Sequence, residues 1–174
     1  MAWTLTADGV EGAADLHGQV TWDGQTVRVL PSKVRLDEQV LDVQPLALAL
    51  LDGTVTLRGR ADLRDPERGV LRFAVNARQL HWGGEAGAPA IIANGDFGLA
   101  GALQAWAAIG TARLERDGQA ADVRFDARGN TERATLKTLQ ARMPTGTLDA
   151  RGEVVWAPSL QWALNADLAG FDPG

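Results

Sequence analysis

The chain has 174 residues, a net charge of −5 and a pI of about 5.0, and this acidic balance argues against a nucleic-acid binder, which needs a concentrated basic surface. It contains no cysteine, so neither a disulfide framework nor a thiolate metal site is possible. It has no apolar run long enough to span a bilayer and no basic-then-apolar start typical of a signal peptide. Because residues 169–174 are typical of an interrupted sequence, we expect a fragment of a longer chain.

The first half of the chain alternates apolar and polar residues in short segments, as strands with one buried face do. Asp23-Gly24 is a hairpin-turn signal. Pro31-Ser32 and Asp37-Glu38 are predicted to separate short strands, and Pro45 to mark a bend or an edge. The predicted strands include residues 3–7, 11–22, 25–30, 39–51, 53–63 and 70–80.

The second half follows a loop at 83–89 and repeats the alternation. Trp106 falls one residue out of phase, which predicts a bulge or a short helical turn from Leu103 to Ile109. A hairpin is predicted around Asp117-Gly118. Residues 131–143 fit either a helix or a strand, and we favour a strand because residues 40–51 also precede a Gly-Thr strand. Residues 145–169 form a last predicted hairpin.

A glycine skeleton recurs along the chain: Gly, five residues, Gly, three residues, then a large apolar residue. It fits Gly12/Gly18/Trp22, Gly53/Gly59/Leu63 and Gly146/Gly152/Trp156, and with one extra residue Gly95/Gly101/Trp106. The segments LRFAVNA (71–77) and LQWALNA (160–166) are also alike. We therefore predict one elongated β module over residues 1–174, made of two tandem units at 1–82 and 90–174 and joined by the Gly-rich loop at 83–89.

These patterns predict an all-β protein of about twelve strands with little or no helix to cover the apolar face of its sheet. Such a sheet can close into a barrel, fold over as a sandwich or curl into a trough. Mid-strand glycines on the apolar face favour curling and leave space; they are Gly18, Gly59, Gly101 and Gly152. Twelve strands stack to roughly 55 Å. We favour a mainly antiparallel sheet curled into a U-shaped trough with an apolar interior.

The segments TGTLDARGEVVW and LQWALNADLAGFDP resemble the repeat units of TamB-type translocation and assembly module proteins, of the AsmA-like superfamily in the Gram-negative envelope. The resemblance implies an internal fragment with a U-shaped β-taco fold in the periplasm. The full-length protein would be anchored in the inner membrane by a segment absent here. It would meet an outer-membrane assembly-factor barrel through parts of the chain that are also absent.

The resemblance further implies that the trough conducts phospholipid toward the outer membrane. By position, the lipid-groove lining would consist of Leu16, Val20, Trp22, Val55, Leu57, Phe73, Val75, Phe97, Leu99, Leu148, Val154, Trp156, Trp162 and Leu164. The residue pattern alone also allows these side chains to be the ordinary core of a sandwich or barrel.

Catalysis has little support in the sequence, and we predict no enzyme. His17 and His81 are far apart, and Ser32 and Ser159 lie beside prolines in turn-like contexts, so a Ser-His-carboxylate set is unsupported. The glycines of residues 95–101 lie within alternating strand rather than between a strand and a helix, unlike a phosphate loop.

Cofactors and metals are not predicted either. Asp122, Asp126 and Asp149 alternate with arginines, so we expect cross-strand partners rather than a calcium site.

The leading hypothesis is a segment of a periplasmic bridge-like protein. Its groove would carry the acyl chains of phospholipid between the inner and outer membranes and support outer-membrane biogenesis. One alternative is a structural or interaction module for outer-membrane protein assembly that pairs through exposed sheet edges. The other is a closed, lipocalin-like small-molecule barrel. Because an excised sheet exposes two edges, a dimer of this chain could be an edge artefact.

Overall fold

The computed structural model describes residues 2–10, 13–22, 25–65, 67–83, 90–157 and 159–170, with side chains described at 17–19 and from residue 26 onward within these ranges. This part of the chain is all strand and turn, with no helix. The strands are β1 (Ala2–Val10), β2 (Ala13–Trp22), β3 (Gln25–Asp37), β4 (Val40–Leu50), β5 (Gly53–Asp62), β6 (Leu71–Trp82), β7 (Ile91–Ala102), β8 (Ala105–Arg116), β9 (Gln119–Gly129), β10 (Arg133–Met143), β11 (Gly146–Val155) and β12 (Gln161–Ala169).

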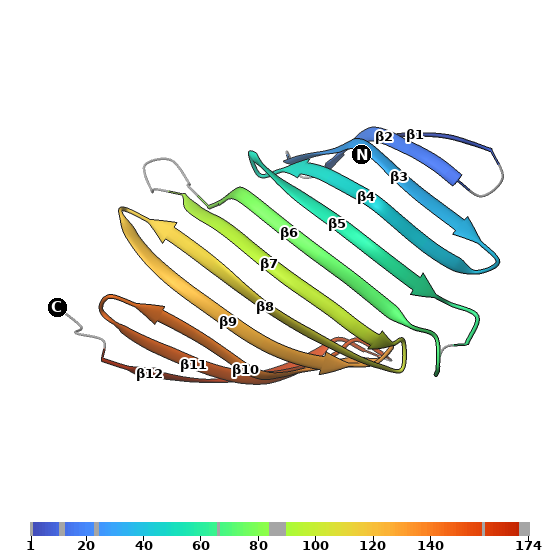
Figure 1. Ribbon diagram of the computed structural model, residues 1–174. Coiled ribbons are helices and arrows are strands. Elements are labelled where there is room, and N and C mark those ends of the chain that lie inside the picture. The colour runs from blue at the N-terminus through green and yellow to red at the C-terminus, as the bar shows by residue number, and fades with distance from the viewer. Residues whose placement is uncertain are drawn as a thin grey trace.

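Each strand pairs antiparallel with its neighbours in sequence, so the sheet is a twelve-stranded meander with β1 and β12 at its edges. Figure 1 shows that the sheet is curved and open, with the strands at its two ends turning out of the plane of the central strands. The predicted all-β, open antiparallel trough is confirmed. The alternative of a closed barrel is wrong, because in the described residues β1 pairs only with β2 and β12 only with β11.

Two-residue turns connect several of the successive strands, whereas longer segments join β5 to β6 and β6 to β7. Asp117 and Gly118 form the predicted turn between β8 and β9, and both have positive φ (52° and 73°), as two-residue hairpin turns favour. The predicted bulge or helical turn from Leu103 to Ile109 is wrong. Leu103 and the next residue form a hairpin turn, and Trp106 lies on β8 opposite Gly101. Trp106 is therefore out of phase with the preceding residues because it lies on the next strand.

Register shifts in β3, β4, β6 and β10 keep the apolar side chains on one face. In β10, Leu136 and Leu139 are three residues apart, yet they pair with Gly152 and Ala150, which are two apart. The extra residue is a β-bulge, without which every following side chain would turn to the other face. The favoured strand at 131–143 is confirmed, and the helix-like spacing of its leucines comes from this bulge.

Ser32 links β3 to β4 by side-chain hydrogen bonds at the place where the register shifts of these two strands meet. It is only 2% exposed; its Oγ accepts a hydrogen bond from the Ala47 amide (2.8 Å) and donates one to the Leu30 carbonyl (2.7 Å). The predicted break at Pro31-Ser32 is wrong, because β3 continues through it. Pro45 lies at the shift in β4, an interior strand, and not at an edge.

Only a few apolar residues of the described chain are buried, and register places them on one face of the sheet. In the described part of the chain they are Val43, Ala61, Leu71, Ala77, Ala141 and Ala150. Most are small, and no second layer covers them. β6 and β7 pair with each other across the predicted boundary, and the division into two units at 1–82 and 90–174 stays a prediction.

Candidate functional site: the apolar face

One face of the sheet, here called the apolar face, is carried by alternate residues from strand to strand. Two rows of paired residues cross it. The first row runs Leu46, Leu57, Val75, Phe97, Gly110, Phe125, Leu139, Ala150 and Ala166. The second runs Val43, Gly59, Phe73, Leu99, Ala108, Ala127, Leu136, Gly152 and Leu164. The alternation in the sequence therefore produces a continuous apolar surface.

The predicted lining residues that the structure describes gather along this face. The half-buried ones are Val55, Leu57, Phe73, Val75, Phe97, Leu99 and Leu148. The exposed ones are Val154, Trp156, Trp162 and Leu164. The side chains of Leu16, Val20 and Trp22 lie outside the described part. Register places those that lie on strands on one shared face, while the lipid-lining role stays a prediction.

Aromatic rings on the apolar face lie over glycines of the next strand. The rings of Phe97 on β7 and Phe125 on β9 are 5.7 Å apart between centroids. Gly110 lies between them on β8, where a Cβ would come within 2.7 Å and 2.6 Å of the two rings. Because Gly110 has no side chain, the rings of Phe97 and Phe125 can approach each other across β8, the strand between them.

The mid-strand glycines do not leave space, contrary to the prediction. At Gly59, which has a φ of 156°, a Cβ would lie 2.1 Å from the Arg72 carbonyl oxygen and 2.5 Å from the Phe73 ring. At Gly101 and Gly152 the nearest atoms are likewise carbonyl oxygens of the neighbouring strand, at 2.3 Å and 2.5 Å. These glycines allow neighbouring strands to approach closely. Their role in curling the sheet stays a prediction, as it does for Gly18.

Two tryptophans are fixed at one end of the strands. The indole Nε1 of Trp106 donates to the Asn130 carbonyl (3.0 Å), and that of Trp156 donates to the Thr131 carbonyl (2.6 Å). Both rings are thus tied to the turn between β9 and β10, with the polar edge of each indole satisfied. Trp106 is missing from the predicted lining because alternation alone places it one residue out of phase. The pairing signal was the Gly101–Trp106 spacing across a two-residue turn.

The opposite face, here called the polar face, carries the charged residues of the strands. Asp122 pairs with its cross-strand neighbour Arg113 (3.2 Å), as expected. Asp149 also has the expected cross-strand partner, because it accepts a hydrogen bond from the side-chain amide of Gln140 (2.8 Å). The expectation is wrong for Asp126, whose Oδ1 is buried without a hydrogen-bond partner.

Asp62 and Arg64 form a local ion pair where β5 ends. The Arg64 side chain and backbone amide both donate to the Asp62 carboxylate, and these hydrogen bonds lower the pKa of Asp62 to about 2. Reciprocally, the Asp62 carboxylate raises the pKa of Arg64. The pair stabilises the chain as it leaves the strand and lies apart from the apolar lining.

The histidines and serines do not assemble into a reactive set. His17 is exposed on β2, whereas the His81 Nδ1 lies 2.9 Å from the Gln79 carbonyl oxygen on β6. Ser32 lies inside β3 rather than in a turn, and Ser159 lies between β11 and β12. Among the residues described, no group of three or more His, Cys, Asp or Glu could hold a metal ion, and no helix is long and apolar enough to cross a membrane.

The open sheet with one apolar face agrees with a match to a protein family. The family model described as TamB, N-terminal domain, matches residues 54–174, which span β5 to β12. The chain belongs to the TamB family. TamB-family proteins are associated with the envelope of Gram-negative bacteria. Comparison with curated proteins and with solved structures finds no match. The resemblance found in the sequence is thereby confirmed at the level of the family.

Proposed function

We propose that the apolar face binds the acyl chains of phospholipid and that this chain is a segment of a bridge-like lipid-transport protein. The observation that carries the proposal is the uncovered apolar face. Leu57, Val75 and Phe97 lie side by side on three central strands and remain partly exposed, since no second layer packs on them. Large uncovered apolar patches are rare on soluble monomers and mark sites that an apolar partner covers.

An acyl chain suits this surface for physical reasons. Each buried methylene contributes about 0.8 kcal/mol, so a few contacts suffice to hold a chain. Because the face repeats similar side chains from strand to strand, a lipid displaced along it exchanges one set of contacts for an equivalent set. Such a surface favours movement along the sheet over tight binding at one point. The absence of directed polar groups from the two rows supports a carrier role rather than catalysis.

The setting follows from the family. We propose a periplasmic position, transport between the inner and outer membranes, and support of outer-membrane biogenesis. Inner-membrane anchoring and contact with an outer-membrane assembly-factor barrel belong to the same proposal and would involve segments outside this chain.

The proposal is tested by charging the apolar face. The double variant Leu57→Asp with Phe97→Asp places two carboxylates on β5 and β7. The control, Thr54→Asp with Ala100→Asp, adds the same charges to the polar face of the same strands, where both side chains are exposed. Each protein is purified from cells and its bound phospholipid is measured by mass spectrometry, with circular dichroism as the check on folding.

Wild type and control should carry phospholipid, and the apolar-face variant should lose most of it while keeping its strand content. Equal phospholipid in all three folded proteins would rule out the apolar face as the lipid site. If the double variant unfolds, a single-cysteine series along the first row, labelled with a polarity-sensitive dye, replaces it. A blue shift on adding phospholipid supports the proposal, and an unchanged spectrum contradicts it.

A second function, strand pairing with a partner, is favoured by β12. Every residue of this strand is exposed, and in the described chain only its β11 side is paired. An unpaired edge offers backbone donors and acceptors to another strand. Charging the apolar face separates the two functions, because edge pairing should survive the double variant and lipid binding should not.

A further inference from the structure

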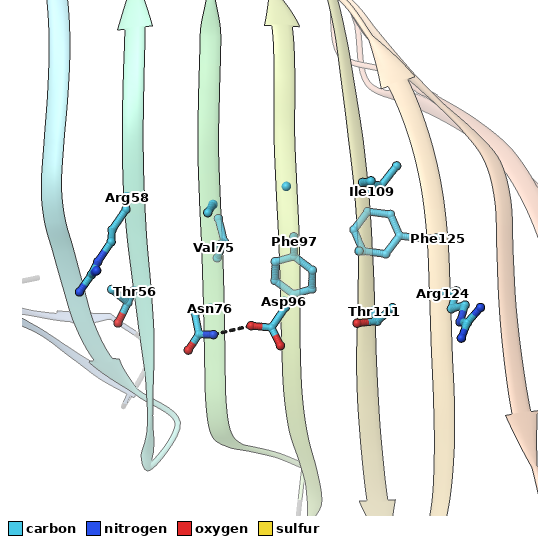
Figure 2. A pocket seen from close by; sticks show the side chains of 13 residues that line it. Thr56, Arg58, Val75, Asn76, Asp96, Phe97, Ile109, Thr111, Arg124 and Phe125 are labelled. Carbon is cyan, nitrogen blue, oxygen red and sulfur yellow. Dashed lines mark hydrogen bonds between the residues drawn. The ribbon is translucent and has the colours of Figure 1, made fainter.

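The polar face of the central strands contains a depression that the proposed lipid function does not use. Its volume is about 870 Å³, within the range of small-molecule sites. Figure 2 shows its lining side chains, which come from β5 to β9. Arg58 and Arg124 stand at its two ends, on β5 and β9. Val75, Phe97 and Phe125 also border it, but they occupy the alternate positions whose side chains belong to the apolar face.

The floor of the depression is open because its residues are small. Ala74 and Gly98 are paired neighbours on β6 and β7, and a Cβ built on Gly98 would meet no atom within 4 Å. Ile109 pairs with Gly98 from β8 and is 62% exposed, an unusual position for a large apolar side chain on the polar face. The floor therefore combines empty space with an apolar contact surface.

The rim of the depression carries neutral hydrogen-bonding groups and unpaired positive charge. Asn76 donates to Asp96, and Arg78 binds both oxygens of the same carboxylate at 3.0 Å and 3.2 Å, so Asp96 is neutralised. The hydroxyls of Thr56 and Thr111 border the same space.

Arginines without an ion pair surround this site, although the chain as a whole is acidic. On the described strands β5, β6, β9 and β10 they are Arg58, Arg60, Arg72, Arg124, Arg128 and Arg142. Arg60 and Arg72 are direct cross-strand neighbours of like charge, and Asp42 on β4 lies opposite Arg60 on its other side and compensates part of this charge. Among the acidic side chains of the described strands β5–β10, all except Asp126 form an ion pair.

We propose that this depression binds an anionic oligosaccharide across β5 to β9. Guanidinium groups bind carboxylate and phosphate oxygens in paired hydrogen bonds, and the two at its ends are four strand spacings apart, or roughly 19 Å. Between them, the C–H faces of sugar rings fit against Ala74 and Ile109, while sugar hydroxyls meet the threonines and Asn76. An apolar floor with a polar rim favours a sugar over a simple anion, because only the sugar has C–H faces that can pack on the floor. The acidic groups of the ligand could be uronate carboxylates or sugar phosphates.

Isothermal titration calorimetry tests the proposal with four probes. Tetragalacturonate and a phosphorylated oligosaccharide of similar length supply the two acidic groups, maltotetraose is the neutral sugar, and tripolyphosphate is the anion without sugar. At least one acidic oligosaccharide should bind, and the stronger of the two identifies the acidic group. Maltotetraose should not bind measurably, and tripolyphosphate should bind at least about tenfold more weakly than the acidic sugar. Equal binding of tripolyphosphate, or no binding of either acidic sugar, overturns the proposal.

Variants locate the binding site. The double variant Arg58→Gln with Arg124→Gln should lower the affinity for the acidic sugar by about tenfold or more. The reason is that a hydrogen bond to a charged group is removed at each end of the depression. Arg28→Gln with Arg151→Gln removes the same charge from exposed polar-face positions on β3 and β11 and should change the affinity less than about twofold. If both double variants weakened binding of the acidic sugar equally, the sugar would be attracted only by the net charge of the protein, and the proposed site would be refuted.

Steric filling provides a test that leaves charge unchanged. Gly98→Leu inserts a side chain into the open floor, where its Cβ meets no atom within 4 Å, and should abolish binding of the acidic sugar. Ala163→Leu at an exposed position of β12 should not. Unchanged affinity in folded Gly98→Leu protein would exclude the depression. Since Gly98 is opposite to the apolar face, phospholipid content should stay at the wild-type level, so failure of this proposal and failure of the lipid proposal give different results.

Discussion

The central strands and the last strand of this sheet carry similar apolar side chains in different environments. Val75 has Leu57 on one side and Phe97 on the other, and all three are half-buried. Trp162 on β12 has a strand on one side only and is 74% exposed. In a sheet without a second layer, a side chain is buried by its neighbours on the two flanking strands. On the apolar face, a paired strand with large side chains on both sides therefore decides burial more than residue type does.

This difference predicts that stability is concentrated where close strand contact and side-chain contact coincide. The largest effect is expected at Gly59. Gly59→Val should destabilise the protein by at least about 3 kcal/mol, because its Cβ would overlap the Arg72 carbonyl and the backbone angle disfavours side chains. Gly98→Val is the control, since a Cβ there meets open space, and its effect should stay within about 1 kcal/mol. Urea unfolding followed by circular dichroism measures both, and similar losses would contradict the close-contact explanation.

Truncation of apolar side chains should show the contrast between centre and edge directly. Phe97→Ala removes a ring that packs on Phe125 and covers Gly110, and it should cost about 2–3 kcal/mol. Leu164→Ala on β12 should cost less than about 1 kcal/mol because the side chain is exposed. The same unfolding measurement compares the two. A cost at Leu164 equal to that at Phe97 would show that the edge is as well packed as the centre.

The buried serine should matter less than the ring. Ser32→Ala leaves the Ala47 amide without its acceptor in a buried position and should cost about 1–2 kcal/mol. Ser159→Ala removes only an exposed hydroxyl near Gln161 and should stay within about 0.5 kcal/mol. Faster hydrogen exchange at Ala47 should accompany the first change. Unaltered exchange there would mean that water or another group replaces the hydroxyl.

The smallest effect is expected at Asp62, where the contact is exposed and local. Its pKa is lowered to about 2 from the ordinary value of 3.8, so the carboxylate stabilises the folded state at neutral pH. That contribution is fully present above the unfolded-state pKa and is lost as the pH falls from about 4 toward about 2. Asp62→Asn should therefore lower the midpoint of thermal unfolding slightly at pH 7 and leave it nearly unchanged at pH 2. If the difference in unfolding midpoint between wild type and variant were the same at pH 7 and pH 2, the effect would come from the shape of the side chain rather than from its charge.

The sequence by itself determined the fold class, the apolar face and the family. Alternation at period two fixes which residues share a face because side chains on a strand point in opposite directions in turn. This rule placed Val55 on β5 and Leu164 on β12 on the same face, as the register shows. It worked because the strands pair with their neighbours in sequence order.

Only the tertiary structure decided the details that depend on a neighbouring strand. The bulge in β10 and the turn before Trp106 both shift the phase by one residue, and local sequence does not separate a bulge from a turn. The role of Gly59 depends on Phe73, and the depression at Gly98 depends on Ala74 and Ile109 across two strand pairings. Alternation determines which face a side chain takes, but register determines which side chains meet on it, and register is a property of the paired strands.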